Sequence, residues 1–190
     1  YRGDGSQLTG ISGGVDSDAQ DNTIGGSGAG SNFSGTSAIN NTLFGKNAGN
    51  SITASDNNVA IGASALSSVS TNFYGDNTAV GNDALAKHTQ SASNSAFGAR
   101  AMGNSVYSAN YCCAFGVEAL GTGQNTATGL VAIGYRALTD NTTGSGSLAV
   151  GRFSLMENTT GMQNTGVGEA TLRTGTTFSA NTALGFNALK

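Results

Sequence analysis

The chain has 190 residues, of which 30 are glycine and none is proline, 10% are charged, and the formal net charge is −3. Eight Lys and Arg residues spread over this length do not make the basic surface of a nucleic-acid-binding protein, and collagen is excluded because it needs abundant proline and glycine at every third position. The densest central apolar run, Leu130 to Ile133, is far shorter than the ~20 residues that cross a bilayer. We therefore expect no membrane insertion. Because the chain begins with Tyr1 rather than Met, we expect a fragment or a processed product.

The first 20 residues differ from the rest of the chain. They are rich in Gly, Ser and Asp and contain no copy of the pattern that fills the remainder. We predict an N-terminal entry segment over 1–20 and a repeat domain over 21–190.

A five-residue motif recurs throughout the repeat domain. Clear copies are Asn-Val-Ala-Ile-Gly at 58–62, Asn-Thr-Ala-Val-Gly at 77–81 and Asn-Thr-Ala-Leu-Gly at 181–185. Successive aligned glycines are 17 to 19 residues apart, and a phase this constant indicates a repeat protein. The repeat glycines are Gly26, Gly45, Gly62, Gly81, Gly98, Gly116, Gly134, Gly151, Gly168 and Gly185.

Each copy continues in the same way after its glycine. The third following residue is small, usually Ala, and the fourth is Leu or Met from Leu66 to Leu189. The first two copies have Gly30 and Gly49 at this fourth position. We therefore expect these two copies to bury less apolar surface than the others.

The period decides the predicted architecture. About 18 residues are too few for a helical repeat, and Asn, Gly and Thr disfavour helix interiors. Apolar residues flank the glycine in two short groups, which favours strands of three to five residues. Such a unit buries its apolar face only by stacking on its neighbours. The sequence predicts an all-β fold, a parallel β-solenoid or β-roll of about ten repeats with a rise of ~4.8 Å per coil.

The residue before each repeat glycine is large and apolar in all copies but the first, and we predict that this column fills the coil interior. Its neighbour, usually Ala, would then face outward and need a partner chain to cover it. We expect the repeat glycine to adopt a positive φ or to admit a second backbone. The Asn that starts each unit is expected in a turn, or in a ladder of side-chain amides. The predicted core column is Phe44, Ile61, Val80, Phe97, Phe115, Ile133, Val150, Val167 and Leu184.

The reactive side chains form no recognisable site. Cys112 and Cys113 are adjacent, so a disulfide between them would be strained, and we predict small apolar fillers, with a cysteine cluster around a trimer axis as the alternative. His88, the single histidine, is predicted to be a solvated loop residue, with a metal or anion site on such an axis as the alternative. We predict no enzyme, no cofactor and no metal site.

The repeat, with Asn-Thr-Thr-Gly spacers at 141–144 and 158–161, resembles the repeat arrays of phage tail fibres. It is also similar to the pattern Asn-Ser-Val-Ala-Ile-Gly in the heads of trimeric autotransporter adhesins, whose repeats are shorter than 17 residues. The segment 3–11, Gly-Asp-Gly-Ser-Gln-Leu-Thr-Gly-Ile, resembles short segments of phage fibre proteins, especially those of marine phages. These resemblances imply a left-handed β-roll in a homotrimer.

The expected function is that of a structural module in a phage tail fibre, a trimeric spacer and host-surface attachment element of the virion. Its expected partners are two further copies of itself and a glycan or protein receptor on the host surface. Tyr74, Tyr107 and Tyr135 are the candidate glycan contacts. The alternatives are the extracellular head domain of a bacterial trimeric surface adhesin and an ice-binding β-solenoid. The latter needs an unbroken column of Thr, and the column from Thr23 to Thr182 is interrupted.

Overall fold

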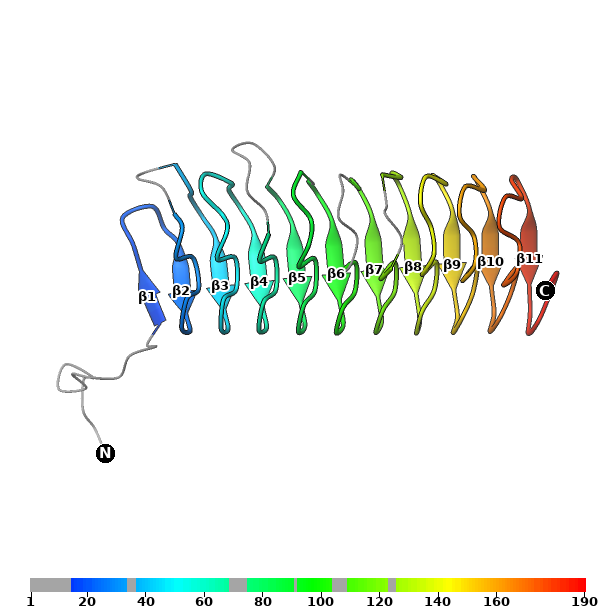
Figure 1. The fold of residues 1–190 in the computed structure, drawn as a ribbon, viewed down its shortest axis with the longest axis horizontal. Coiled ribbons are helices and arrows are strands. Elements are labelled where there is room, and N and C mark those ends of the chain that lie inside the picture. The colour runs from blue at the N-terminus through cyan, green and yellow to red at the C-terminus, as the bar shows by residue number, and fades with distance from the viewer. Residues whose placement is uncertain (1–14, 34–36, 69–74, 91, 104–108, 123–125) are drawn as a thin grey trace, which may run out of the picture.

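The computed structural model describes residues 15–33, 37–68, 75–90, 92–103, 109–122 and 126–190, which form a rod of stacked coils (Figure 1). Short turns lie along one edge of the rod and longer spacer loops along the other. The described strands are β1 Val15–Ser17, β2 Thr23–Gly25, β3 Thr42–Phe44, β4 Val59–Ile61, β5 Thr78–Val80, β6 Ser95–Phe97, β7 Cys113–Phe115, β8 Val131–Ile133, β9 Leu148–Val150, β10 Thr165–Val167 and β11 Thr182–Leu184.

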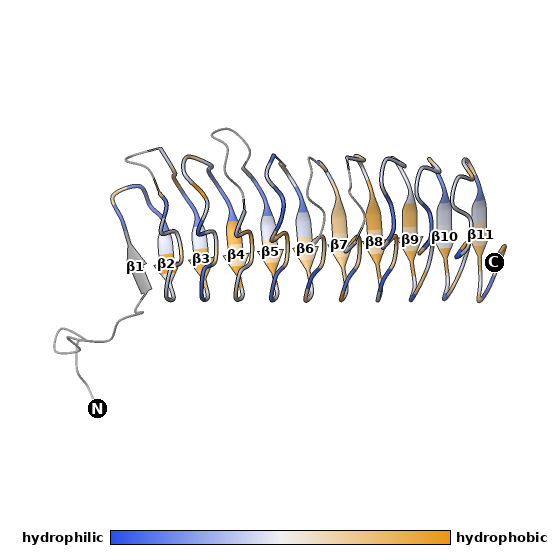
Figure 2. Ribbon diagram, viewed as in Figure 1, coloured by the Kyte–Doolittle hydropathy of each residue, from blue (hydrophilic) through white to orange (hydrophobic). Residues whose placement is uncertain are grey.

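The strands form one sheet in sequence order, and each of β2 to β11 comes from one repeat. Neighbours from β2 to β11 are parallel, and equivalent residues pair, as in Ala60 with Ala79 and Ala79 with Ala96. Each position of the repeat therefore becomes a column along the rod. The predicted parallel β-solenoid is confirmed. Each repeat supplies one strand, and the apolar group that follows the glycine lies in a turn rather than in a strand. Figure 2 shows apolar colour on β4 and β7 to β9 and hydrophilic colour along much of the spacer edge.

The repeat glycines turn the chain directly after each strand. Gly45 has φ 135°, and a Cβ placed on it would lie 2.6 Å from the backbone carbonyl of Gly62 in the next coil. Both expectations for this column are thus confirmed, and the approaching backbone belongs to the neighbouring coil of the same chain. A side chain here would have to displace backbone, which explains why every repeat keeps glycine.

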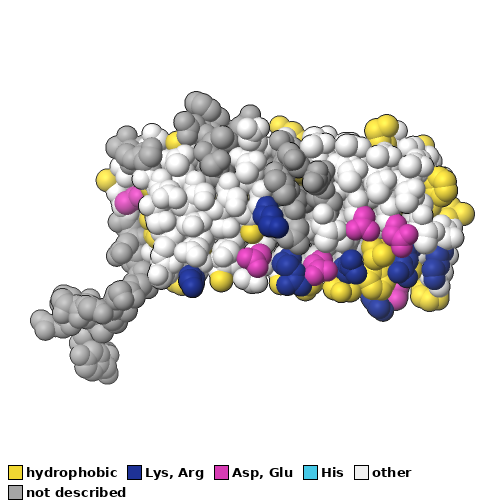
Figure 3. Space-filling view, in the orientation of Figure 1, with side chains coloured by type: hydrophobic (Ala, Val, Ile, Leu, Met, Phe, Trp, Pro, Cys, Tyr) yellow, Lys and Arg dark blue, Asp and Glu magenta, His cyan; other side chains and the backbone are white. Residues whose placement is uncertain are grey.

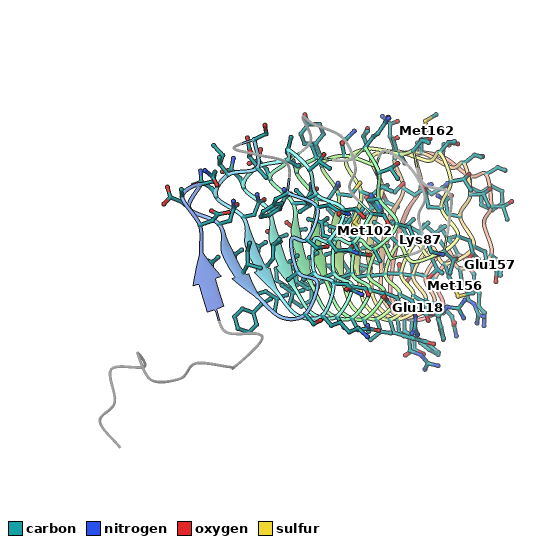
Figure 4. All side chains as sticks on the ribbon, turned by 60° about the vertical axis from the view of Figure 1, so that its left-hand side comes forward. Lys87, Met102, Glu118, Met156, Glu157 and Met162 are labelled. Carbon is teal, nitrogen blue, oxygen red and sulfur yellow. The ribbon has the colours of Figure 1, made fainter. Side chains whose placement is uncertain are left out.

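From the third to the ninth repeat, the interior of each coil is filled by the small strand residue together with the Leu or Met that follows the turn. Ala79 and Leu85 are fully buried, as are Ala96 and Met102. In Figure 4, Met102 lies inside the coil, whereas Glu118 and Met162 lie at opposite edges of the rod.

The predicted core column was wrong, because the residue before each glycine points away from the interior. Strand residues alternate between faces, and a coil of this size has room on its inner side only for the Leu or Met and a small strand residue. The large residues therefore lie outside, either exposed or half-buried: Phe44, Ile61, Val80, Phe97, Phe115, Ile133, Val150, Val167 and Leu184. The surface left uncovered is thus the column of large residues rather than the Ala column.

A ladder of buried asparagines runs beside the strands, as the sequence suggested. In each step the Oδ1 of one Asn accepts hydrogen bonds from the backbone N–H and the side-chain amide of the next. Asn41 Oδ1, for example, lies 2.9 Å from Asn58 N and 3.0 Å from Asn58 Nδ2. The ladder satisfies amides that would otherwise be costly to bury. It is interrupted at Cys112, Leu130 and Ser147, which occupy the Asn position in three successive repeats.

Candidate interaction surface

The outer side of the β2–β11 sheet is a continuous uncharged surface. We call it the outward sheet face and define it as the first and third residues of strands β2 to β11. The third residues include Phe44, Phe115 and Leu184, which are 47%, 54% and 77% exposed. Adjacent rings stack along it, with the centroids of Phe97 and Phe115 5.0 Å apart. Exposed apolar patches of several hundred Å² usually mark interaction sites, and this face runs along all ten parallel strands.

The first residues of these strands make the second column of the outward sheet face. Thr, Ser, Val, Cys and Leu occupy it, and none of them carries a charge. Thr occurs in half of the repeats, and the column is interrupted between Thr78 and Thr165 by Ser95, Cys113, Val131 and Leu148.

Charged side chains gather instead along the turns that follow the repeat glycines. Figure 3 shows them along the lower edge of the rod, beneath the middle and C-terminal coils. Glu118 accepts from Arg100 at 2.6 Å and lies 3.5 Å from the Nε of Arg136. Arg152 and Glu169 form another pair at 3.2 Å. Because these pairs are substantially exposed, each contributes little to stability. We call this region the charged turn edge.

Among the candidate glycan contacts, Tyr135 lies on the charged turn edge and is 43% exposed. Its ring packs edge-on against Phe153, with the centroids 5.5 Å apart, and the Arg152 guanidinium lies 4.4 Å from the Phe153 centroid. Tyr135 therefore sits among charged and aromatic groups at the surface. Tyr74 and Tyr107 lie outside the described residues.

The two cysteines are free and point to opposite sides of the sheet. Cys112 is buried in the Asn column, and burial raises the pKa of its thiol to about 11. Cys113 is half-buried on the outward sheet face, between Ser95 and Val131. The filler prediction fits Cys112, whereas Cys113 lies on the outward sheet face and fills no interior space.

The prediction for His88 was wrong, since its side chain is fully buried. Burial lowers the pKa of His88 to about 4, so the imidazole is neutral at pH 7. His88 is the seventh residue after its repeat glycine, and the same position holds the buried Ile52, Asn141 and Asn158 in other repeats. Alignment of these spacers would have placed the histidine inside the coil.

Within the described residues, no three or more His, Cys, Asp or Glu side chains come together in a way that would hold a metal ion. The same part of the chain contains no helix long and apolar enough to cross a membrane.

Comparison of the chain with protein-family models, with curated proteins and with solved structures found no match. The function proposed below therefore rests on the geometry of the outward sheet face.

Proposed function

We propose that this chain is a structural module of a phage tail fibre, in which three copies pack through their outward sheet faces and act as a spacer and host-surface attachment element of the virion. The observation that supports this proposal is the uncharged, partly aromatic outward sheet face. Ten strands at the usual spacing extend it over roughly 43 Å. The number of three copies and a left-handed winding come from the resemblance of the repeat to fibre and adhesin repeats.

The proposed assembly suits a mechanical role. Each coil contributes parallel strand pairing along the rod, and association would bury the column from Phe44 to Leu184 between chains. Burial of apolar area contributes about 25 cal/mol per Å² before the costs of association. The charged turn edge lies at the margin of the sheet and would remain open to a host receptor, with Tyr135 as the proposed glycan contact.

The test is the oligomeric state of matched variants, measured by sedimentation equilibrium. The intact chain is expected to be a homotrimer. Phe115→Glu places a charge on the outward sheet face and should yield folded monomers, because a buried unpaired carboxylate is costly. The matched control is Val117→Glu, two residues later on the turn, where Val117 is 40% exposed. This control should remain trimeric.

Cys113 gives a second measurement in the same samples. It should resist alkylation in the assembled protein and react readily in Phe115→Glu, while the buried Cys112 stays unreactive in both. A folded monomer of the intact chain, or identical behaviour of the two Glu variants, would refute the proposed packing.

A further inference from the structure

Two aromatic rings on the charged turn edge lie among arginines. Tyr135 and Phe153 come from the turns of successive repeats, and their ring centroids are 5.5 Å apart. The guanidinium carbons of Arg152 and Arg173 lie 4.4 Å and 5.1 Å from the centroid of Phe153. Arg136 directly follows Tyr135. We call these five residues the aromatic–arginine cluster, and Figure 3 shows hydrophobic atoms between charged groups along this edge.

The arginines of the cluster have more hydrogen-bond donors than the neighbouring glutamates use. Glu118 accepts from Arg100 at 2.6 Å, but it lies 3.5 Å from the Nε of Arg136. The Nε of Arg173 lies 3.8 Å from Glu157. Both of these Nε atoms are buried and have no hydrogen-bond partner among the described residues. Buried donors without a partner are uncommon in folded proteins, so the groups left uncommitted at this edge are donors rather than acceptors.

The charge at this edge is also unbalanced. In the ion pairs that the described residues form there, four arginines face three glutamates. The Arg152 side chain is 57% exposed and contacts Glu169 through one nitrogen at 3.2 Å. Exposed pairs of this kind contribute little free energy, so a ligand can rearrange them at small cost. A ligand that matches this edge therefore supplies negative charge and acceptor oxygens.

The two rings specify the rest of the ligand. Aromatic faces are apolar and carry a partial negative charge, so they favour the polarised C–H face of a sugar ring. A guanidinium presents its N–H donors in a planar fork that matches a carboxylate. A neutral saccharide would leave the excess positive charge unmatched, and an acidic peptide would leave the ring pair unused.

We propose that the aromatic–arginine cluster binds a carboxylate-bearing saccharide. The sugar ring packs on Tyr135 and Phe153, and its carboxylate accepts hydrogen bonds from Arg152, the most exposed of the three cluster arginines. The inference rests on the proposed attachment role of the chain and names the chemical class of the host ligand.

The cluster is complete within one chain. Its residues come from the turns of three successive repeats and lie apart from the outward sheet face. A further turn packs beyond it, since Asn187 N donates to the Glu169 carbonyl and Leu172 N donates to the Ala188 carbonyl. Binding at this site should therefore not depend on the association of chains.

The probes are two labelled acidic oligosaccharides, one of uronic acid and one of sialic acid, and binding to the intact protein is measured by fluorescence anisotropy. The matched control ligand is the uronic acid oligosaccharide with its carboxyl groups reduced to alcohols, which keeps the sugar ring and removes the charge. A peptide of glutamates tests the alternative of an acidic protein partner.

The protein variants separate this site from the general charge of the edge. Arg152→Gln removes the charge and keeps most of the side-chain length. Tyr135→Val removes the ring and introduces the residue type that Val117 has at the equivalent position of the preceding repeat. The matched control is Arg100→Gln, which removes the same charge from the same edge two repeats before Tyr135.

We expect at least one acidic oligosaccharide to bind, and the reduced form of the uronic acid ligand to bind about tenfold more weakly than its acidic form or not at all. Arg152→Gln and Tyr135→Val should each weaken binding by about fivefold or more. Arg100→Gln should change it by less than about twofold, because charges beyond a Debye length are screened. Circular dichroism checks that each variant is folded, and the comparison of ligands on the intact chain decides the question if a variant is not.

No binding of either acidic oligosaccharide would overturn the proposal, as would equal binding of the reduced form or of the glutamate peptide. Equal weakening by Arg100→Gln and Arg152→Gln would also overturn it. Phe115→Glu distinguishes this site from the proposed assembly, since its monomers should bind the acidic ligand as the intact chain does. A chain that binds but does not form trimers refutes only the packing of the sheet faces, and a trimer that does not bind refutes only the saccharide site.

Discussion

The first two repeats and the later repeats fill the same interior with opposite arrangements of large and small side chains. In the second repeat, Leu43 lies on the strand and Gly49 follows the turn. In the fourth, Ala79 lies on the strand and Leu85 follows the turn. A Cβ on Gly49 would lie 2.7 Å from Leu43 Cδ2, so the strand Leu occupies the space that the turn Leu takes elsewhere. Each coil therefore contains one large and one small side chain in its interior. Which of the two comes from the strand and which follows the turn differs between the early and the later repeats.

The backbone explains why glycine is acceptable at the turn position. Gly49 has φ 56° and Leu85 has φ 51°, so both lie in the left-handed region. A left-handed backbone costs a non-glycine residue roughly 1–2 kcal/mol, which buried Leu85 offsets through its packing. The early coils were expected to bury less apolar surface because Gly30 and Gly49 replace the Leu that follows the turn in later repeats. In the second coil, other residues fill the interior. Leu43 and Ile52 are both fully buried there.

The largest effect should come from the glycine that both regions share. Gly134→Ala combines a φ of 127° with a Cβ 2.7 Å from the Gly151 carbonyl, and we expect a loss of about 4 kcal/mol, which is exceptional for a point mutation. Gly45→Ala, in an early coil, should cost a similar amount because Gly62 approaches it equally closely. Urea unfolding at a fixed protein concentration measures both.

The control for this prediction is Gly185→Ala. Its φ of 119° imposes the same backbone strain, but no neighbour lies within 4 Å. It should cost only about 1–2 kcal/mol, as expected from strain alone. Equal losses at Gly134 and Gly185 would show that coil-to-coil contact contributes nothing.

The next effect tests the exchange of large and small residues directly. Leu85→Gly should destabilise the protein by about 3 kcal/mol through the cavity it leaves, and Ala79→Leu by about 1–3 kcal/mol through overpacking. The double variant reproduces the arrangement of Leu43 and Gly49. It should be more stable than the sum of the single changes predicts, by about 2 kcal/mol.

The same unfolding experiment on the two single variants and the double variant completes this cycle. If the losses of unfolding free energy in the two single variants simply add in the double variant, Ala79 and Leu85 do not occupy a shared space. Packing would then not explain the difference between the early and the later coils.

The smallest effect concerns the seventh residue after the glycine, which is Ile52 in an early coil and His88 in a later one. Burial lowers the pKa of His88 from an ordinary value of 6.5 to about 4, so the unfolded chain binds a proton in this interval before the folded chain does. Stability should therefore fall as the pH is lowered from 6.5 to 4, with a loss of about 2 kcal/mol at pH 5.

His88→Asn is the control, because Asn141 and Asn158 are buried at the equivalent position. Hydrogen bonds from the Asn22 side chain and backbone lower the pKa of Asp18 from 3.8, so this carboxylate titrates below the interval. The His88→Asn variant should unfold at the same urea concentration at pH 7 and pH 5. An acid sensitivity equal to that of the intact chain would assign the effect to other groups.

Much of the fold was predictable because the repeat is regular. The period and the small, turn-favouring composition indicated a parallel solenoid, and Gly and Asn at fixed positions indicated the turn and the ladder. The alternation along β4 also showed that Ala60 and Ile61 face opposite sides. It did not show which side is inside, since that depends on Leu66 folding back from the turn at a left-handed φ.

Two further features required the structure. His88 lies in a spacer of mainly polar residues, and it is buried because neighbouring coils stack on it. Asp18 lies outside any copy of the repeat, and its carboxylate accepts hydrogen bonds from Asn22, across the turn by which β1 folds back on β2. Neither feature has a local sequence pattern, because both depend on contacts with residues in another strand or coil.

The sequence alone determined the stacking of equivalent residues, because a 17–19-residue unit buries its apolar groups only against copies of itself. It also determined the glycine turn and the asparagine ladder, which follow from the backbone and amide chemistry of those residues. Only the tertiary structure decided which strand face is interior, since the width of the coil sets whether Ala or Phe fits. It likewise decided that the large residues form an outer surface and that β1 pairs antiparallel with β2.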